Sequence, residues 1–262
     1  MAKKKPAAQN RKKIASKNKP RKKQPKKADA NKEPRRKRVA SPLQDKTIQR
    51  VLRKLDLQTV EPWAQQDAIE AFAKGDPQGF TDAAYSTGGT LAIVVDNGRL
   101  LMNAGIYEAA LVHGYTGCKW SHRLWDMDVI QSLFDWGDRE KLRAVGSSLP
   151  GPGPFTLYRG VSREGKERQV DGMSWISSLD VACFFALVLK HDPAVYQATV
   201  PADDVYCYFL ERGEDEFICR PKESQRLPLS LEEIEKGAAR WNEAKKVHEQ
   251  QMLKQVASKT ES

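Results

Sequence analysis

The stretch "FLERGEDEFICRP", residues 209–221, places several acidic residues directly before an apolar run. The run Phe217, Ile218 and Cys219 is short and continuous, which is typical of a buried strand. Acidic residues in a turn are usually only solvated, but Glu216 stands at the first position of this predicted strand, residues 216–219. A carboxylate that is held by rigid backbone in this way is a candidate functional group.

The segments around this stretch predict further strands with one helix among them. Strand-like runs occupy residues 155–160, 194–201 and 204–210, and a helical pattern occupies residues 178–190. A short strand that carries Ser174 is expected just before that helix. Because these strands follow a largely helical first half, the predicted fold class is α+β.

The region 43–75 predicts two helices. The apolar residues of the first are spaced for one side of a helix: Leu52, Leu55, Leu57, Val60 and Trp63. The second helix is expected to begin after Pro62 and to end at Gly75, since proline suits a first turn and glycine suits a helix end.

The rest of the first half mixes turn signals with helical patterns. Residues 90–102 contain β-branched side chains and the pair Asn97-Gly98, which predict a β-hairpin. Residues 105–115 and 126–145 predict helices. The run 146–154 is rich in glycine and proline and is expected to end this half of the chain.

The chain closes with a predicted long helix from Ser230. Ser230 and Glu233 have the spacing of a capping box. The apolar stripe expected to dock this helix on the body comprises Leu231, Ile234, Ala238, Trp241 and Val247. The predicted organisation is therefore a disordered basic tail (1–42), a mainly helical lobe (43–150), a core (151–229) that could form one domain with that lobe, and the C-terminal helix and tail (230–262).

Charge is distributed unevenly along the 262 residues, whose formal net charge is +10. Residues 1–41 hold 18 Lys/Arg and 2 Asp/Glu, which leaves 26 basic and 32 acidic residues in the remainder. A segment so poor in apolar residues cannot offset its ordering entropy, so disorder is predicted. Residues 3–38 are expected to contact nucleic acid without sequence preference, or to serve only as a solubilising tail.

The cysteines and the N-terminus indicate a compartment. Four cysteines show no paired spacing, which favours a reducing environment without a disulfide framework. His113, Cys118 and His122 match no common zinc spacing, so no metal is expected. No secretory signal and no membrane span are expected, and a cytoplasmic location is predicted, or a nuclear one in a eukaryotic host.

Three short motifs in the second half carry candidate chemistry. The motif "LYRG" places Arg159 at a strand end before Gly160; a guanidinium suits phosphate, and glycine permits close backbone approach. The segment "GMSWISSLDVACFFA" (172–186) sets Ser174 ahead of the predicted helix. In an extended "GEDEFI", Glu214 and Glu216 would share one face, as suits stabilising a cation and taking a proton.

This ordered set resembles the ADP-ribosyltransferases whose signature is Arg, then a Ser-Thr-Ser strand, then Glu-x-Glu. The resemblance covers about residues 155–221, and Ser174 precedes the helix residue Ala182 by eight positions, as in the family. Trp175 and Ile176 replace the threonine and the second serine, so one of three hydroxyls is kept. The resemblance implies a split, mixed or antiparallel sheet that binds NAD as co-substrate.

The resemblance also implies roles for the residues. Arg159 and Gly160 would bind the cofactor, with Arg159 on its phosphates or its nicotinamide ribose. Ser174 would hold that ribose and orient the catalytic Glu216, which stabilises an oxocarbenium-like transition state. Glu214 would meet the acceptor, a protein arginine.

Two points are left open by the resemblance. An aromatic side chain would stack on nicotinamide, with Trp175, Phe184 and Tyr158 as the candidates. Among the acids of the opening stretch, Glu211 and Asp215 are expected to tolerate substitution, and Asp180 is expected to be structural at a helix start.

Three functions remain in competition at this point. The first is a mono-ADP-ribosyltransferase that modifies protein arginine. The second keeps the fold but modifies a nucleic acid or a target bound to nucleic acid, as the basic tail would allow. The third is a non-catalytic polyanion-binding protein, which the loss of two hydroxyls from the Ser-Thr-Ser strand favours.

Overall fold

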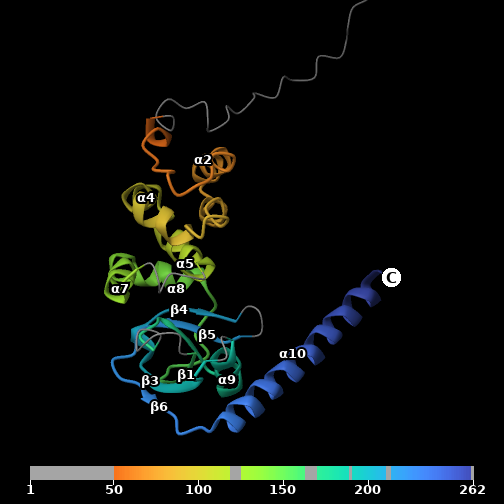
Figure 1. The fold of residues 1–262 in the computed structure, drawn as a ribbon. Coiled ribbons are helices and arrows are strands. Elements are labelled where there is room, and N and C mark those ends of the chain that lie inside the picture. The colour runs from red at the N-terminus through yellow and green to blue at the C-terminus, as the bar shows by residue number, and fades with distance from the viewer. Residues whose placement is uncertain (1–49, 119–124, 163–169, 189–190, 211–213, 261–262) are drawn as a thin grey trace, which may run out of the picture. The chain divides into compact units, whose positions relative to one another are not determined.

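The computed structural model describes residues 50–118, 125–162, 170–188, 191–210 and 214–260 (Figure 1). The predicted basic tail, 1–42, lies outside these residues. Ala40–Ser262 form one compact unit. In the part of the chain that is described, no helix is long and apolar enough to cross a bilayer.

The first half consists of helices joined by short turns. Their bounds are α2 Gln65–Lys74, α3 Pro77–Asp82, α4 Thr90–Ala104, α5 Tyr107–Gly117, α7 Met127–Trp136 and α8 Arg139–Val145. The predicted end of α2 is confirmed, because Gly75 adopts a left-handed conformation there and its N–H bonds the last turn. Its start lies a few residues beyond Pro62, at Gln65.

The predicted hairpin at residues 90–102 is wrong, because this segment lies within helix α4. Leu91, Val94 and Leu101 are buried at helical spacing. The buried Asn97 does not form a turn. Its side chain accepts a hydrogen bond from the Asp56 N–H (2.8 Å) and donates one to the Asp56 carbonyl (2.7 Å). A tertiary contact of this kind outweighs a local turn signal.

Two other expectations for the helical half need correction. Leu52 and Val60 are buried as predicted, but Trp63 is 73% exposed, since it precedes α2 and lies outside the apolar side. The single helical segment predicted at 126–145 is divided at Gly137. Asp138 starts a new helix there, because its carboxylate accepts hydrogen bonds from two backbone N–H groups of α8.

The second half forms one antiparallel sheet of six strands in the order β4-β5-β2-β1-β3-β6. Its strands are β1 Phe155–Val161, β2 Ser174–Ile176, β3 Ala194–Val200, β4 Val205–Phe209, β5 Glu216–Cys219 and β6 Gln225–Arg226. The predicted strands are confirmed, and the polar pair of β6 carried no signal in the sequence. The fold is therefore α+β.

The helices α9 (Leu179–Leu187) and α10 (Leu231–Thr260) belong to the second half (Figure 1). Strand β1 lies directly against α9, since a Cβ at Gly160 would lie 1.9 Å from the Ala182 carbonyl oxygen. Gly160 thus serves helix packing, whereas the sequence analysis assigned it to cofactor binding.

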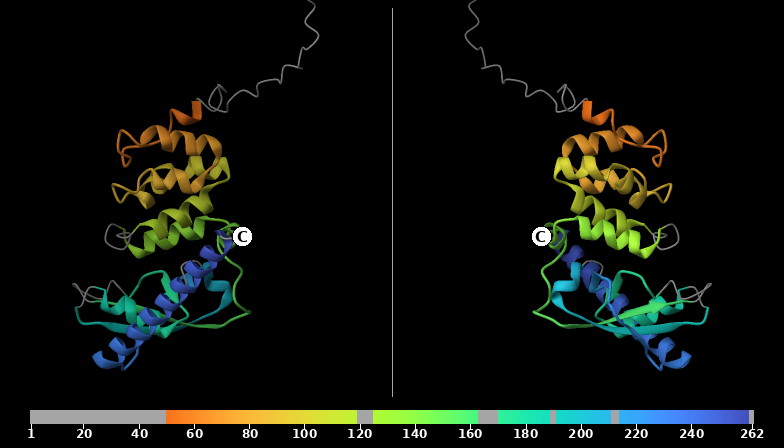
Figure 2. Two further views of the ribbon diagram at one scale, coloured as in Figure 1. Left: turned by 90° about the vertical axis from the view of Figure 1, so that its right-hand side faces the viewer. Right: turned by 90° about the vertical axis from the view of Figure 1, so that its left-hand side faces the viewer.

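Helix α10 is one unbroken helix (Figure 2) and starts as predicted. Its capping box is formed, because the Glu233 carboxylate accepts hydrogen bonds from Ser230 and the Ser230 hydroxyl accepts one from the Glu233 N–H. Ile234 and Ala238 are buried in a core with α9. Leu231 and Val247 are exposed, so the predicted docking stripe is used only in part.

Candidate active site

Arg159, Ser174 and Glu216 line one cavity of about 160 Å³. They come from β1, β2 and β5, which are neighbours in the sheet although their residues are far apart in the sequence. The remaining wall comes from Gly172 and from the helical half, with Tyr115, Thr116, Cys118 and Met127. The strand order therefore brings the three predicted residues together.

The Ser174 hydroxyl donates a hydrogen bond to Oε1 of Glu216. Strands β2 and β5 pair so that Ser174 lies opposite Ile218 and Glu216 lies opposite Ile176. Residues directly opposite in an antiparallel pair point to the same face, so Ser174 and Glu216 share a face as diagonal neighbours. The serine thereby orients the carboxylate at the cavity.

Arg159 is partly buried beside this pair, and its Nη1 donates a hydrogen bond to the Ser174 carbonyl at 2.5 Å. Burial lowers its pKa, and the neighbouring Tyr115 and Glu216 oppose that effect. The guanidinium nevertheless stays charged, because arginine does not deprotonate in proteins. The cavity therefore contains a fixed cation close to a carboxylate.

Gly172 makes room for this arginine and was missed by the sequence analysis. A Cβ at this position would lie 2.0 Å from Nη2 of Arg159, so any other residue would collide with the guanidinium. The Gly172 carbonyl accepts a hydrogen bond from Nε1 of Trp175 at 2.8 Å, which fixes the segment over Arg159. An isolated glycine in a polar stretch of sequence gives no signal for this role.

Tyr115 is the aromatic side chain that the structure places at the cavity wall. It comes from α5, in the segment 105–115 for which the sequence predicted a helix and no functional role. Burial raises its pKa to about 12, with Arg159 opposing the shift and Glu216 adding to it. Its phenol is thus neutral at ordinary pH and able to donate a hydrogen bond.

The predicted stacking aromatics lie elsewhere. Trp175 is only 2% exposed and packs in a core with Leu157 and Phe217, because it follows Ser174 in a strand and points to the opposite face. Phe184 lies on α9 with its ring edge-on to Phe185. Tyr158 packs in the core shared with α9. Neither Trp175, Phe184 nor Tyr158 lines the Arg159 cavity.

The other acids of residues 209–221 differ from one another. Asp215 holds the turn before β5, because its carboxylate accepts a hydrogen bond from Ser177 Oγ (2.7 Å) and its carbonyl accepts one from the Ser177 N–H (3.2 Å). It therefore has a structural contact where tolerance to substitution was expected. Glu214 is partly buried and lies outside the residues that line the cavity. Glu211 is outside the described residues.

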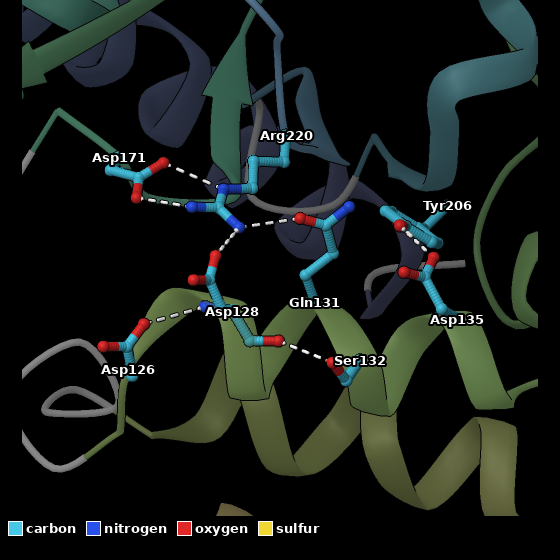
Figure 3. Close-up of polar contacts among 8 residues, drawn as sticks. All are labelled: Asp126, Asp128, Gln131, Ser132, Asp135, Asp171, Tyr206 and Arg220. Atoms are coloured by element: carbon cyan, nitrogen blue, oxygen red, sulfur yellow. Dashed lines mark hydrogen bonds and ion pairs between the residues drawn. The ribbon is translucent and has the colours of Figure 1, made fainter.

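Arg220 follows β5 and fixes the other side of the Gly172 segment (Figure 3). Its Nε and Nη2 donate to the two carboxylate oxygens of Asp171, at 2.9 and 2.7 Å. Its Nη1 donates to Asp128 (2.6 Å) and Gln131 (2.7 Å) on α7. The hydrogen bonds to Asp171 raise the pKa of Arg220. This arginine therefore links α7 to the segment that covers Arg159.

Asp180, expected to be structural, forms an ion pair with Arg240 of α10 at 2.5 Å. Within the described ranges no group of His, Cys, Asp and Glu side chains is arranged to hold a metal ion, and His122 lies outside them. Comparison with protein-family models, with curated proteins and with solved structures found no match.

Proposed function

We propose that the protein is an NAD-dependent mono-ADP-ribosyltransferase that transfers ADP-ribose to a protein side chain, arginine being the favoured acceptor. The observation that carries the proposal is the convergence of Arg159, Ser174 and Glu216 on one cavity, with Ser174 hydrogen-bonded to Glu216. An acidic turn that is only solvated and a strand arginine without a shared role would not be expected to line the same cavity.

The arrangement supports a simple chemical role for Glu216. As nicotinamide leaves with the electron pair of its bond to ribose, positive charge develops on the sugar. A carboxylate preorganised beside that carbon stabilises this charge without reorganising, and the Ser174 hydroxyl holds the carboxylate in place. The acceptor nitrogen then bonds to the same carbon and gives up a proton.

Glu214 is assigned to the acceptor in this proposal. It precedes β5 and lies outside the Arg159 cavity, so it would meet a group that approaches from outside rather than the sugar. A carboxylate there can bind a guanidinium through two hydrogen bonds and accept its proton.

The size of the cavity limits what it can hold. Its volume of about 160 Å³ lies below the range of about 300–1,000 Å³ that is usual for whole ligands. The nicotinamide and its ribose are therefore the parts assigned to this cavity, and the rest of the dinucleotide needs a second surface.

The test is to incubate the full chain with NAD and a protein acceptor and to follow nicotinamide release and modified arginine by mass spectrometry. Glu216→Ala should lower both transfer and NAD hydrolysis by at least about 10³-fold. Glu214→Gln should lose transfer and keep hydrolysis. Full activity of Glu216→Ala would refute the site.

The competing acceptor is separated by the same assay. Residues 1–41 are strongly basic, which favours delivery to nucleic acid. Label from NAD that is found only in nuclease-sensitive material would replace the arginine acceptor by a nucleic acid. Calorimetry that detects no binding at millimolar NAD would leave the non-catalytic alternative.

A further inference from the structure

A second cavity, of about 340 Å³, lies beside the Arg159 cavity and belongs to no role assigned so far. Its wall contains three cations, Arg139, Arg220 and Lys222. They come from the start of α8 and from the segment after β5. Cavities of this size accept small ligands, and this one is lined by polar groups with few apolar ones.

Arg139 is a cation of this wall whose charge is not paired with a carboxylate of the described residues. Its guanidinium carbon lies over the Tyr206 ring, 3.7 Å from the ring centre, in a cation–π contact. Nη1 is buried and has no hydrogen-bond partner, and no described residue forms an ion pair with Arg139. Tyr206 is itself fixed, because its hydroxyl donates to Asp135 at 2.5 Å (Figure 3). The guanidinium is therefore preset rather than free to swing into solvent.

The balance of charge in the wall is positive. Asp171 and Asp204 also line the cavity, but both carboxylate oxygens of Asp171 are engaged by Arg220. Lys222 is exposed and adds a mobile cation at the rim. Arginine and lysine placed together in this way suit a phosphate, which arginine binds through two parallel hydrogen bonds and lysine as a point charge.

The segment Asp171-Gly172 borders both cavities, since Asp171 lines the Arg139 cavity and Gly172 lines the Arg159 cavity. A third hollow, of about 270 Å³, is lined by Asp171, Gly172, Arg220 and Lys222. Gly172 also lines the Arg159 cavity, and the other three also line the Arg139 cavity. A ligand that reaches from the Arg159 cavity across Gly172 would therefore meet Lys222, which lines both this hollow and the Arg139 cavity.

We propose that Arg139 and Lys222 form a binding site for a diphosphate, and that this diphosphate belongs to the dinucleotide whose nicotinamide end enters the Arg159 cavity. The site as a diphosphate site stands on its own geometry, and naming the dinucleotide rests on the proposed function. Arg159 is partly buried, donates to the Ser174 carbonyl and carries one positive charge, so the two negative charges of the diphosphate require further cations.

The experiment measures binding of ADP to the full chain by calorimetry at about 0.15 M salt, an ionic strength that screens distant charges. Arg139→Gln keeps a planar group over Tyr206 and removes the charge, and Lys222→Gln changes an exposed side chain that packs in no core. Lys141→Gln is the matched control, since Lys141 is an exposed cation of α8 outside the cavity. The basic residues 1–41 are present in every variant, so any contribution they make to ADP binding is the same in all of them.

The expected result is that ADP binds the parent chain and that Arg139→Gln and Lys222→Gln each weaken its affinity about tenfold, the loss of one charged hydrogen bond. Lys141→Gln should bind as the parent does. Absence of ADP binding to the parent chain, or binding by both cavity variants with the affinity of the parent, would overturn the site. A single-stranded oligonucleotide that binds in place of ADP with the same dependence would overturn its assignment to a diphosphate.

The failure of this site and the failure of the proposed function give different results. ADP binding that depends on Arg139 and Lys222, in a chain that consumes no NAD, would refute the reaction and keep the diphosphate site. NAD consumption that is lost in Glu216→Ala but keeps its KM in Arg139→Gln and Lys222→Gln would keep the reaction and refute the diphosphate site.

Discussion

The two ends of strand β5 illustrate two uses of a charged side chain. At the start, Glu216 accepts a hydrogen bond from Ser174 and faces a cavity. Just past the end, Arg220 donates four hydrogen bonds to three side chains and joins α7 to Asp171. At the Arg220 end the protein itself engages all three guanidinium nitrogens, whereas the Glu216 end keeps lone pairs that a substrate can use.

This difference suggests how to distinguish a side chain that acts on a substrate from one that only stabilises the fold. A charge whose hydrogen bonds are all satisfied by the fold contributes rigidity and little else. A charge held by one contact at a cavity wall is restrained but still able to react. Substitution at the two ends should accordingly change different measured quantities.

The largest expected effect on stability lies at the Arg220 end. Arg220→Met should lower the free energy of unfolding by about 2–3 kcal/mol, because Asp171 would keep a charge without its partner. This is less than for a fully buried pair, since Asp171 is half exposed. Chemical denaturation measures it, with Lys74→Met, which breaks an exposed pair with Glu70, as the control. Equal stability of the two variants would show that the Arg220 contacts are dispensable.

Gly172 lies between the two ends, and its substitution should lower both the stability of the protein and its affinity for NAD. Gly172→Ala should cost roughly 2 kcal/mol of stability, because the new methyl group overlaps the Arg159 guanidinium. Affinity for NAD should fall as well, since Arg159 must move. Gly151→Ala is the control, because open space surrounds that position. Unchanged melting and NAD affinity in Gly172→Ala would mean that the arginine is not held in the described position.

At the Glu216 end, Ser174→Ala should change activity and leave stability nearly unchanged. Loss of the hydroxyl frees the Glu216 carboxylate to rotate, which should lower kcat about tenfold, or about 1.4 kcal/mol in the barrier. Steady-state kinetics measures kcat and KM separately. Ser177→Ala, which loses the contact with Asp215, is the comparison. A drop in unfolding free energy without a change in kcat would assign Ser174 to support.

The smallest expected effect is the change in the free energy of unfolding at alkaline pH. The pKa of Tyr115 is raised to about 12 by burial, above its value near 10 in an unfolded chain. Its contribution to stability is therefore complete below pH 10 and is lost as the pH rises from 10 toward 12, by about 1 kcal/mol at pH 11.

Arg220 stays charged over this range, because Asp171 raises its pKa. Burial also raises the pKa values of Tyr107 and Cys207 to about 12, so only the part of the loss that disappears in Tyr115→Phe belongs to the cavity end of the sheet. Denaturation of Tyr115→Phe at pH 9 and pH 11 measures it, and the difference between the two pH values should shrink by that amount. An equal difference in the parent and in Tyr115→Phe would remove Tyr115 as the cause.

Local pattern predicted most of the elements. The strands 155–160, 194–201 and 204–210, the helix ended by Gly75 and the capping box at Ser230 all depend on residues close in sequence. The hairpin predicted at 90–102 was wrong because a local pattern does not contain long-range contacts. Asn97, which suggested a turn, instead forms a hydrogen bond with Asp56 on a distant part of the chain.

The resemblance to the Arg, Ser-Thr-Ser and Glu-x-Glu signature grouped Arg159, Ser174 and Glu216 as a set, and each lies on a strand that the local pattern predicted. Their meeting at one cavity depends on the strand order β5-β2-β1, which no local pattern contains. The same holds for Tyr115, Gly172, Arg139 and Arg220: their roles arise from contacts between segments far apart in the chain. Pairing of strands and packing of helices are long-range events, so only the tertiary structure decided which side chains share a site.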